Sequence, residues 1–437
     1  MEMKTVRVDF GQTKFANKKT NQKDRVVLDT TKTINGHILI AGASGTGKTH
    51  QLRRVIDAMS KQPPHPRFHI IDVHGDLDIP GASSCKFSES SPYGVNPLKV
   101  DPDPHSGGVR KRARSFIASL NRTTSKLGTK QESALYHLLT DLYEANGFYL
   151  DKPESWDVKT DLRRNPRHPK KQPTLGDLKT FAEWRLAQMT TGAGSKALSK
   201  LDELNRKVRQ LHRKSDKGDD SEQKQVEKLR AEAADLYREY VMAVETGREL
   251  PQYLTYAGRD VMQSVFERIS NLESSGIFRP RKPDFDLNAP VRRYDISALS
   301  RDEQILFIDF LASEMFQAAR RKGQAAHPRD FIVIDESHAF VSAEPDHILN
   351  VIIRESRKFG IGLILASQSL SDFPDDIIAN TSTKVILGLD EMFHASTARK
   401  LAIDPKRFGW VYPRRTALIQ IKRAGDTSNR YLDVELC

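Results

Sequence analysis

One segment of the chain, residues 37–50, constrains the fold more than any other. It begins with an apolar strand, residues 37–41, runs through the pattern G-x-x-x-x-G-K-[ST], and continues into a segment with helical spacing of apolar residues. Glycines adopt backbone angles that a Cβ atom would forbid, so successive amide N–H groups can turn inward around phosphate oxygens. A strand, such a loop and a helix in this order predict a phosphate-binding loop, with the helix N-terminus facing the anion.

The residue types in this loop predict a site for a nucleoside triphosphate and a magnesium ion. Lys48 would reach the β- and γ-phosphates as a point charge, and the hydroxyl of Thr49 would be a ligand of Mg²⁺. ATP and Mg²⁺ are therefore the expected cofactors. The predicted nucleotide-binding residues are Gly42, Ala43, Ser44, Gly45, Thr46, Gly47, Lys48, Thr49 and His50.

A second apolar strand, residues 331–334, ends in two acids and is the expected partner of the phosphate-binding loop. Asp335 would hold Mg²⁺, directly or through water, and Glu336 would be the general base for the attacking water. Gln368 follows the next apolar strand, residues 362–366. Ligands bind at the carboxyl edge of such sheets, so we expect this glutamine to sense the γ-phosphate or hold the water. A strand-end cap is the alternative.

Two arginines, Arg354 and Arg357, lie near the end of a helix that is expected to start near residue 346. An arginine from a neighbouring subunit can neutralise charge in the transition state of phosphoryl transfer, and Arg357 is the preferred candidate. The alternative is that both side chains complement the C-terminal dipole of their helix.

Nearly continuous apolar strands alternate with helices, which predicts an α/β fold with a sheet buried on both faces. The region between the two nucleotide motifs changes to helical periodicity and is expected to be an insertion, after a polar stretch that lasts to about residue 130. An antiparallel helical hairpin is expected within it, either for simple packing or for docking a partner. The expected strands span residues 6–10, 25–29, 37–41, 68–73, 291–296, 331–334, 362–366, 384–388 and 417–421. The expected parts are a β-rich lead-in (1–30), the first part of the core (31–105), a basic linker and helical insertion (106–280, hairpin 197–245) and the second part of the core (281–437).

The balance of charge favours a polyanionic partner. The 437 residues carry a formal net charge of +12, which makes nucleic acid plausible, although a solvated basic surface is the alternative for any one cluster. The basic residues gather in two runs, Arg110, Lys111, Arg112 and Arg114, and then Arg163, Arg164, Arg167, Lys170 and Lys171.

The remaining composition narrows the class of protein. Two cysteines, Cys85 and Cys437, exclude a disulfide framework and suit a reducing compartment. No stretch approaches the roughly 18 consecutive apolar residues of a membrane span, and the first residues do not read as a signal peptide. We therefore expect a cytoplasmic protein with no membrane partner.

The order of these motifs resembles the HerA/FtsK superfamily of P-loop ATPases, and the HerA branch most closely. The resemblance rests on residues 35–42, 71–77, 295–299, 335–340 and 354–368 and extends over roughly residues 25–100 and 255–425. It implies a RecA-like core with a helical insertion between the Walker A and Walker B motifs. It also implies a hexameric ring that hydrolyses ATP at subunit interfaces and translocates double-stranded DNA. Proteins of this type often act with a nuclease in DNA end resection or anti-phage defence.

Two departures from the HerA pattern are visible. HerA proteins usually carry an N-terminal β-barrel, and residues 1–36 are too few for a full one. Ser337 occupies the position after the two acids where alanine is usual. Two other functions stay open beside the DNA translocase or helicase: a nucleotide-dependent scaffold that activates a partner effector, and a conjugative or type IV secretion ATPase.

Overall fold

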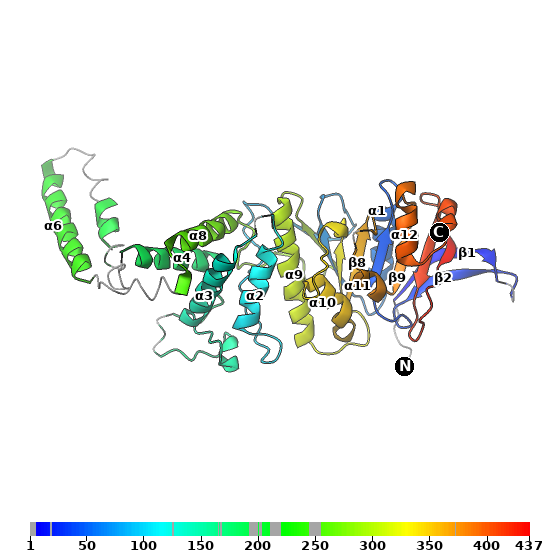
Figure 1. Ribbon diagram of the computed structural model, residues 1–437, viewed down its shortest axis with the longest axis horizontal. Helices are drawn as coiled ribbons and strands as arrows, with labels where there is room; N and C mark the ends of the chain where they lie inside the picture. Colours follow the sequence, from blue (N-terminus) through cyan, green and yellow to red (C-terminus); the bar gives the residue numbers. More distant parts are fainter. Residues whose placement is uncertain are drawn as a thin grey trace. The chain divides into compact units, whose positions relative to one another are not determined.

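The computed structural model divides the chain into two compact units (Figure 1). The core unit comprises Met1–Val95 and Arg281–Cys437, and the insert unit comprises Asn96–Pro280. The described residues are 6–17, 20–124, 126–164, 166, 168–191, 200, 203–209, 220–243, 255–371 and 373–437.

The first boundary between the units lies before Asn96, whereas the boundary expected from the sequence lies after residue 105. Side-chain hydrogen bonds explain the difference. The amide of Asn96 donates to the Pro173 carbonyl oxygen (3.0 Å), and the backbone N–H of Val100 donates to the side chain of Gln172 (2.9 Å). These bonds tie the segment after residue 95 to the insert unit.

The core unit is built on one 11-stranded sheet, in the order β2-β1-β11-β10-β9-β3-β8-β7-β4-β6-β5. The strands from β9 to β5 in that order are parallel, and β10, β11, β1 and β2 extend the sheet antiparallel. The strands are β1 (Arg7–Ala16), β2 (Lys23–Asp29), β3 (Ile38–Ala41), β4 (Arg67–Asp72), β5 (Ser83–Lys86), β6 (Val291–Asp295), β7 (Asp330–Ile334), β8 (Ile361–Ser367), β9 (Thr383–Ile386), β10 (Thr416–Ile421) and β11 (Leu432–Leu436).

The predicted α/β class is confirmed, and every expected strand is present. Two strands, β5 and β11, are not among the expected ones. β5 lies at the edge of the sheet and contributes only one buried side chain, Cys85, so it carries no apolar run. β11 has no continuous apolar run, but it alternates apolar and acidic residues over five positions, the pattern of a half-buried strand that the expected strands leave out. The β-rich lead-in is part of the core sheet, because β1 pairs with both β2 and β11.

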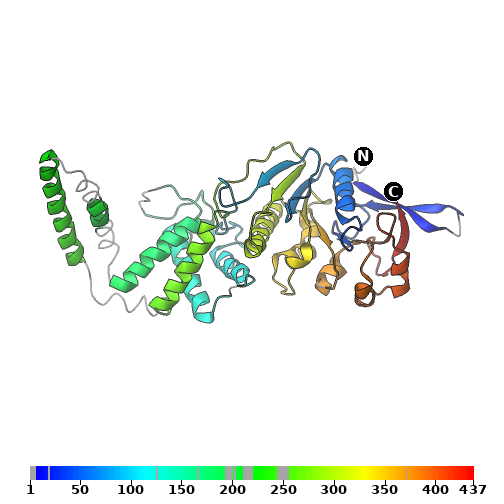
Figure 2. The ribbon, with the colours of Figure 1, turned by 90° about the horizontal axis from the view of Figure 1, so that it is seen from above.

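Helices cover both faces of the parallel part of the sheet. The core-unit helices are α1 (Lys48–Ser60), α9 (Arg301–Arg321), α10 (Ile348–Glu355), α11 (Asp375–Asn380) and α12 (His394–Leu401). From β3 to β4 the chain moves toward the β5 edge of the sheet. From β6 through β7 and β8 to β9 it moves in the opposite direction. Right-handed crossovers then place α1 on one face and α9 and α10 on the other, as Figure 2 shows.

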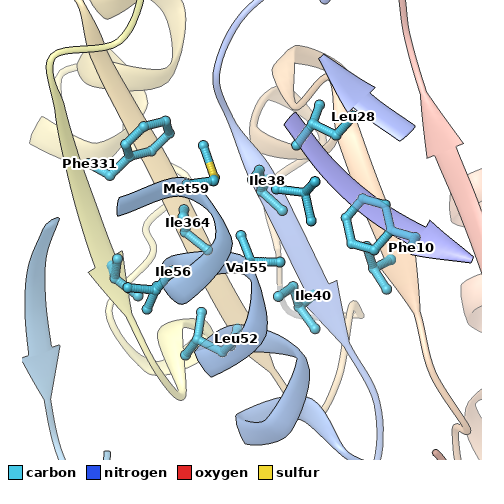
Figure 3. Packing of buried hydrophobic residues seen from close by; sticks show 14 of the residues in the cluster. Phe10, Leu28, Ile38, Ile40, Leu52, Val55, Ile56, Met59, Phe331 and Ile364 are labelled. Carbon is cyan, nitrogen blue, oxygen red and sulfur yellow. The ribbon is translucent and has the colours of Figure 1, made fainter. Parts of the chain in front are cut away.

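The face covered by α1 forms the main hydrophobic core (Figure 3). Leu52, Val55, Ile56 and Met59 recur at helical spacing and are fully buried. They pack on side chains of β3, β7 and β8, and Phe10 of β1 extends the same cluster. Burial of apolar surface contributes about 25 cal/mol per Å² removed from water. This free energy holds α1 against β3, the strand that precedes the phosphate-binding loop.

The insert unit is helical in its described residues, apart from its loops. Its helices are α2 (Val109–Leu120), α3 (Thr129–Ala145), α4 (Leu175–Thr191), α6 (Asp220–Ala243) and α8 (Arg259–Ser274). α2 replaces the basic linker expected from the sequence. Its apolar side chains Phe116 and Leu120 are buried, and Arg112 from the first basic run is only 5% exposed. Arg110, Lys111 and Arg114 remain exposed, with Arg110 and Arg114 on the side of the helix opposite to Arg112.

In the second basic run, Arg163, Lys170 and Lys171 form intramolecular bonds, whereas Arg164 is exposed and Arg167 lies outside the described residues. Arg163 forms a bidentate pair with Asp161, with N···O distances of 2.9 and 2.6 Å. Lys170 is buried, and its ammonium group donates to the carbonyl oxygens of Ser155 and Thr160. These two side chains stabilise the loop before α4 and are not a free basic surface.

The hairpin predicted at residues 197–245 lies partly outside the described residues, which here are 200, 203–209 and 220–243. Within them, Lys200 pairs with Glu239 (2.7 Å) and Lys207 with Glu232 (2.6 Å). From the first pair to the second, the lysine lies later in the sequence and its glutamate partner lies earlier, which indicates that the two segments run antiparallel. Among the described residues, no helix is long and apolar enough to cross a membrane.

The packing of α1 predicts a large loss of stability when its buried face is truncated. Ile56→Ala removes a fully buried side chain, and we expect it to lower the free energy of unfolding by about 2–5 kcal/mol. Urea unfolding followed by circular dichroism measures the change. Leu287→Ala is the control because Leu287 is 85% exposed, and its effect should stay within about 0.5 kcal/mol. Equal effects of the two variants would contradict this packing.

Candidate active site

The phosphate-binding loop connects β3 to α1, and its glycines are required by its geometry. Gly45 and Gly47 have φ angles of 77° and 105°, which side-chain-bearing residues rarely adopt. A Cβ atom on Gly42 would lie 2.5 Å from the Thr46 hydroxyl oxygen and 2.8 Å from the Cβ of Leu387. The loop therefore keeps a shape in which its backbone N–H groups can surround an anion.

Bonds to neighbouring segments hold the loop in place. The backbone N–H of Gly42 donates to the Ser367 carbonyl oxygen (3.1 Å), and that of Ala43 donates to the Gly388 carbonyl oxygen (2.7 Å). The Thr46 hydroxyl donates back to the Ala43 carbonyl oxygen (2.7 Å). The loop is thus anchored to the ends of β8 and β9 and to itself.

The remaining predicted loop residues lie around the start of α1. Ser44 and His50 are exposed and Thr49 is half-buried, whereas Lys48 is 8% exposed. α1 has no side-chain N-cap hydrogen bond. The first N–H groups of a helix have no partner within the helix, so they are available to a phosphate.

Lys48 and Glu336 meet at the carboxyl edge of the sheet. Lys48 Nζ lies 3.9 Å from Glu336 Oε1 and 3.5 Å from the carbonyl oxygen of Ala43. The sheet order β3-β8-β7 explains the approach, because the loop after β3 and the acids after β7 are separated by one strand only. The intervening strand, β8, leads into Gln368, whose amide donates to Glu336 Oε1 (2.8 Å).

The two acids after β7 have different surroundings. Asp335 is 6% exposed, and its Oδ1 accepts the backbone N–H of Glu336 (2.8 Å). Burial raises the pKa of Asp335, and the negative charges of Glu336 and Asp76 act in the same direction. Glu336 has a φ of 47°, in the left-handed region. This backbone conformation turns its side chain to Lys48 and Gln368 while Asp335 stays buried.

Ser337, which departs from the usual alanine, has a structural role. It is fully buried, and its hydroxyl donates to the Ala366 carbonyl oxygen of β8 (2.8 Å). His338 Nδ1 lies 3.4 Å from Glu336 Oε2. The sequence alone predicts no role for Ser337 or His338, and the one signal that it offers is their position beside the two acids.

The turn after β4 lies at the same edge and is held by a buried carboxylate. Asp72 is 1% exposed and accepts the backbone N–H groups of Gly75 (2.8 Å) and Leu77 (2.9 Å). Arg293 of β6 pairs with it at 2.6 Å. These contacts fix the turn that carries Asp76.

The predicted arginines are not part of this cluster within one chain. Arg354 donates to the Pro345 carbonyl oxygen and lies 3.8 Å from Asp376. Arg357 is exposed in the short 3-10 segment Ser356–Phe359. The structure therefore brings together Lys48, Asp335, Glu336 and Gln368, and leaves both arginines on the surface of α10 and the segment after it.

The residues present fit a nucleotide with a magnesium ion. Mg²⁺ prefers oxygen ligands, keeps several waters, and is commonly held by one or two protein oxygens together with substrate phosphates. The Asp335 carboxylate and the Thr49 hydroxyl are such donors. A Cβ at Gly42 would collide with the Thr46 hydroxyl and with Leu387, so the loop keeps its shape around an anion only with glycine there. The raised pKa of Asp335 indicates a carboxylate that a cation would stabilise.

The buried carboxylate predicts a pH-dependent effect of Asp335→Asn on stability. The pKa of Asp335 is raised on folding, so the folded state binds more protons and wild-type stability falls as the pH rises through that raised pKa. Without magnesium, the variant should be more stable than wild type at pH 8, and the difference should shrink toward pH 4. Thermal unfolding in a chelator measures it.

Asp57→Asn is the control, because Asp57 is exposed on α1 and 56% of its side chain is accessible. It should show no comparable gain at pH 8. A chelated Asp335→Asn protein that is less stable than wild type at pH 8 would contradict the electrostatic account.

Comparison with known proteins agrees with these observations. The family described as "Helicase HerA-like C-terminal" matches residues 14–89. The "Probable DNA double-strand break repair helicase HerA" of Methanocaldococcus jannaschii is 26% identical over 150 residues, which are 33% of this chain and 25% of that protein. The match thus spans about a quarter of the length of this relative.

Solved structures share the fold over nearly the whole chain. VirB4 of Thermoanaerobacter pseudethanolicus superposes with a TM-score of 0.62 at 15% identity, covering 98% of this chain and 96% of that one. The plasmid coupling protein TrwB in complex with ADP and Mg²⁺ gives a TM-score of 0.53 at 14% identity, covering 98% and 95%. Together with the match to the HerA-like family model, these likenesses confirm the predicted resemblance to the HerA/FtsK-type P-loop ATPases, and at 15% and 14% identity the solved structures show the fold alone.

Proposed function

We propose that this chain binds ATP with Mg²⁺, hydrolyses it, and uses the energy to move along DNA as a ring-forming HerA-like translocase or helicase. The observation that carries the proposal is the cluster at the carboxyl edge of β3, β8 and β7. There Lys48 Nζ lies 3.9 Å from Glu336 Oε1, and the Gln368 amide donates to the same oxygen at 2.8 Å.

Each residue of the cluster has a distinct role in this proposal. Lys48 binds the β- and γ-phosphates, and the Thr49 hydroxyl and the Asp335 carboxylate hold the metal ion. The bound Mg²⁺ would neutralise charge that develops on the phosphate oxygens. Glu336 takes a proton from the attacking water, and Gln368 holds the carboxylate of Glu336 in the orientation this step needs.

An exposed arginine completes the proposed site from another subunit. Arg357 is exposed, and we propose that it enters the nucleotide site of a neighbouring copy, where it would stabilise the transition-state charge. Arg354 is the weaker candidate because it already contacts Pro345 and Asp376. A hexameric ring is the assembly we propose, following the HerA resemblance.

DNA is the proposed polyanion, and double-stranded DNA is the expected form. The net charge of +12 supports it, as do the exposed side chains of Arg110, Lys111 and Arg114 on α2. The relative in Methanocaldococcus jannaschii bears the name "Probable DNA double-strand break repair helicase HerA". A nuclease partner, DNA end processing or anti-phage defence, and a cytoplasmic site of action belong to the same proposal and rest on the resemblance to HerA.

A nucleotide-dependent scaffold is the second candidate, supported by the antiparallel arm that the pairs Lys200–Glu239 and Lys207–Glu232 stabilise. A scaffold needs ATP binding but not hydrolysis. A Glu336→Gln variant that binds ATP, does not hydrolyse it and still activates its partner would favour the scaffold. A secretion or conjugation ATPase is the third candidate, because VirB4 and TrwB share this fold. At 15% and 14% identity the likeness describes the fold alone, so it does not favour this candidate over the other two.

Two substitutions test the hydrolysis step. Glu336→Gln removes the general base and should lower kcat for ATP by about 10²- to 10⁴-fold while ATP still binds. Lys48→Ala should abolish phosphate release by weakening the binding of the nucleotide. Release of inorganic phosphate gives the rate, and a fluorescent ATP analogue gives the affinity.

Lys61→Ala is the matched control for Lys48→Ala, because it removes a lysine near the other end of α1 whose side chain is 71% exposed. Its rate and affinity should equal those of wild type. A Glu336→Gln protein with an unchanged rate would overturn the proposed role of the cluster.

Salt dependence tests the binding of DNA. Duplex DNA should stimulate the ATPase rate, and the logarithm of the DNA affinity should fall linearly with the logarithm of salt, by about 0.9 for each phosphate contact. The double variant Arg110→Ala with Arg114→Ala should bind more weakly and flatten this slope by about one contact for each arginine. Fluorescence anisotropy over a salt series measures both. Affinity that does not depend on salt would exclude the proposed phosphate contacts.

A further inference from the structure

A turn that precedes β10, residues 411–415, lies against the phosphate-binding loop. The strand β10 is antiparallel to β9, with Leu418 opposite Ile386, so β10 begins at the edge where β9 ends. The backbone N–H of Arg414 donates to the Thr46 carbonyl oxygen at 3.2 Å. A Cβ atom on Gly388 would lie 3.7 Å from Pro413 Cγ and 3.2 Å from the Thr46 methyl group.

Within this turn, Arg414 has a backbone conformation that favours glycine. Its φ is 61°, in the left-handed region, which costs free energy for any residue that carries a Cβ. Its backbone N–H is already fixed by Thr46. A glycine would satisfy the same turn without this cost. Arginine therefore either has a function at this position that offsets the backbone cost, or is merely tolerated there. The position of its side chain distinguishes these alternatives.

The side chain of Arg414 runs over the last glycine of the phosphate-binding loop. Its Cγ lies 3.2 Å from the place that a Cβ of Gly47 would occupy. Gly47 directly precedes Lys48 and is the N-cap of α1. The N–H groups that follow an N-cap are those that helices offer to phosphates.

The charge of Arg414 is available to a ligand. Arg414 is exposed, and in the part of the chain that the structure describes no carboxylate forms an ion pair with it. A guanidinium offers five N–H donors in a planar fork that matches the oxygens of a phosphate. The Arg414 side chain starts beside Gly47, so a guanidinium without a carboxylate partner among the described residues is carried next to the phosphate-binding loop and is suited to an anionic ligand held there.

We infer that Arg414 is a nucleotide-binding residue, which donates to the phosphate oxygens of the nucleoside di- or triphosphate held by its own loop. The inference rests on the proposed function, in that this loop binds a nucleotide. Lys48 binds the phosphates from the start of α1, and Arg414 binds them from the outer side of Gly47. Because Arg414 belongs to the same unit as the loop, it acts without a neighbouring subunit, unlike the role proposed for Arg357.

Binding of ADP with Mg²⁺ tests this assignment without any need for hydrolysis or DNA. The loss of charged hydrogen bonds in Arg414→Ala should weaken ADP affinity by about 10- to 100-fold. Arg414→Lys keeps a charge without the fork and should fall between this variant and wild type. Arg415→Ala is the matched control. It removes the same charge one residue away. Because Arg415 is exposed, we expect the ADP affinity to change less than about twofold. Isothermal titration calorimetry measures all four proteins.

A second variant separates binding from folding. Arg414→Gly removes the side chain and relieves the left-handed backbone, so without nucleotide its Tm should equal or exceed that of wild type, while its ADP affinity falls as in Arg414→Ala. Unchanged ADP affinity in Arg414→Ala and Arg414→Gly would overturn the assignment, and so would an equal loss in Arg415→Ala. Failure of the proposed function itself looks different: wild type would bind no ADP, and Lys48→Ala would make no difference.

Discussion

The approach of Lys48 to Glu336, with 3.9 Å between Nζ and Oε1, is the contact on which the candidate site depends. It exists because β3 and β7 flank β8 in a parallel sheet, so the chain segments that follow the three strands converge at one edge. Burial of Asp335 beside Glu336 concentrates negative charge there and raises the pKa of Asp335. One lysine cannot balance two carboxylates and the phosphates of a nucleotide. A bound divalent cation would restore the balance, which is why the fold and the proposed Mg²⁺–ATP chemistry agree.

Sequence reasoning predicted the centre of the fold better than its periphery. The central strands are buried on both faces, so their apolar runs are visible in the sequence. β5 and β11 are less buried and carry polar or acidic residues, so they give no such run. The basic residues of α2 made this helix look like a linker in the sequence. The sequence does not show that the Arg112 side chain is buried whereas those of Arg110 and Arg114 are exposed. Lys170 also looked like part of a basic surface in the sequence, but its ammonium group donates hydrogen bonds to backbone carbonyl oxygens.

The site divides in a similar way. The phosphate-binding loop and the two acids follow spacing rules that have a mechanical cause, so Lys48, Asp335 and Glu336 could be named in advance, and their roles stay proposals. Gln368 could be placed because a strand end in a parallel sheet marks the ligand edge. Arg414 follows no such rule: it lies far from the loop in sequence, and only the antiparallel return of β10 brings it to Gly47. Its left-handed φ is invisible in the sequence, because most residues with φ above zero are glycines.

The central claim is that Lys48, Thr49 and Asp335 form one site for a nucleotide and its metal ion. Electron paramagnetic resonance with Mn²⁺ in place of Mg²⁺ tests it most directly, because the bound ion reports phosphorus nuclei in its coordination sphere. The account predicts that the protein and ADP together hold Mn²⁺ with a resolved coupling to ³¹P, and that Asp335→Asn loses this species while Asp57→Asn keeps it. A spectrum identical to that of Mn²⁺ and ADP without protein would contradict the account.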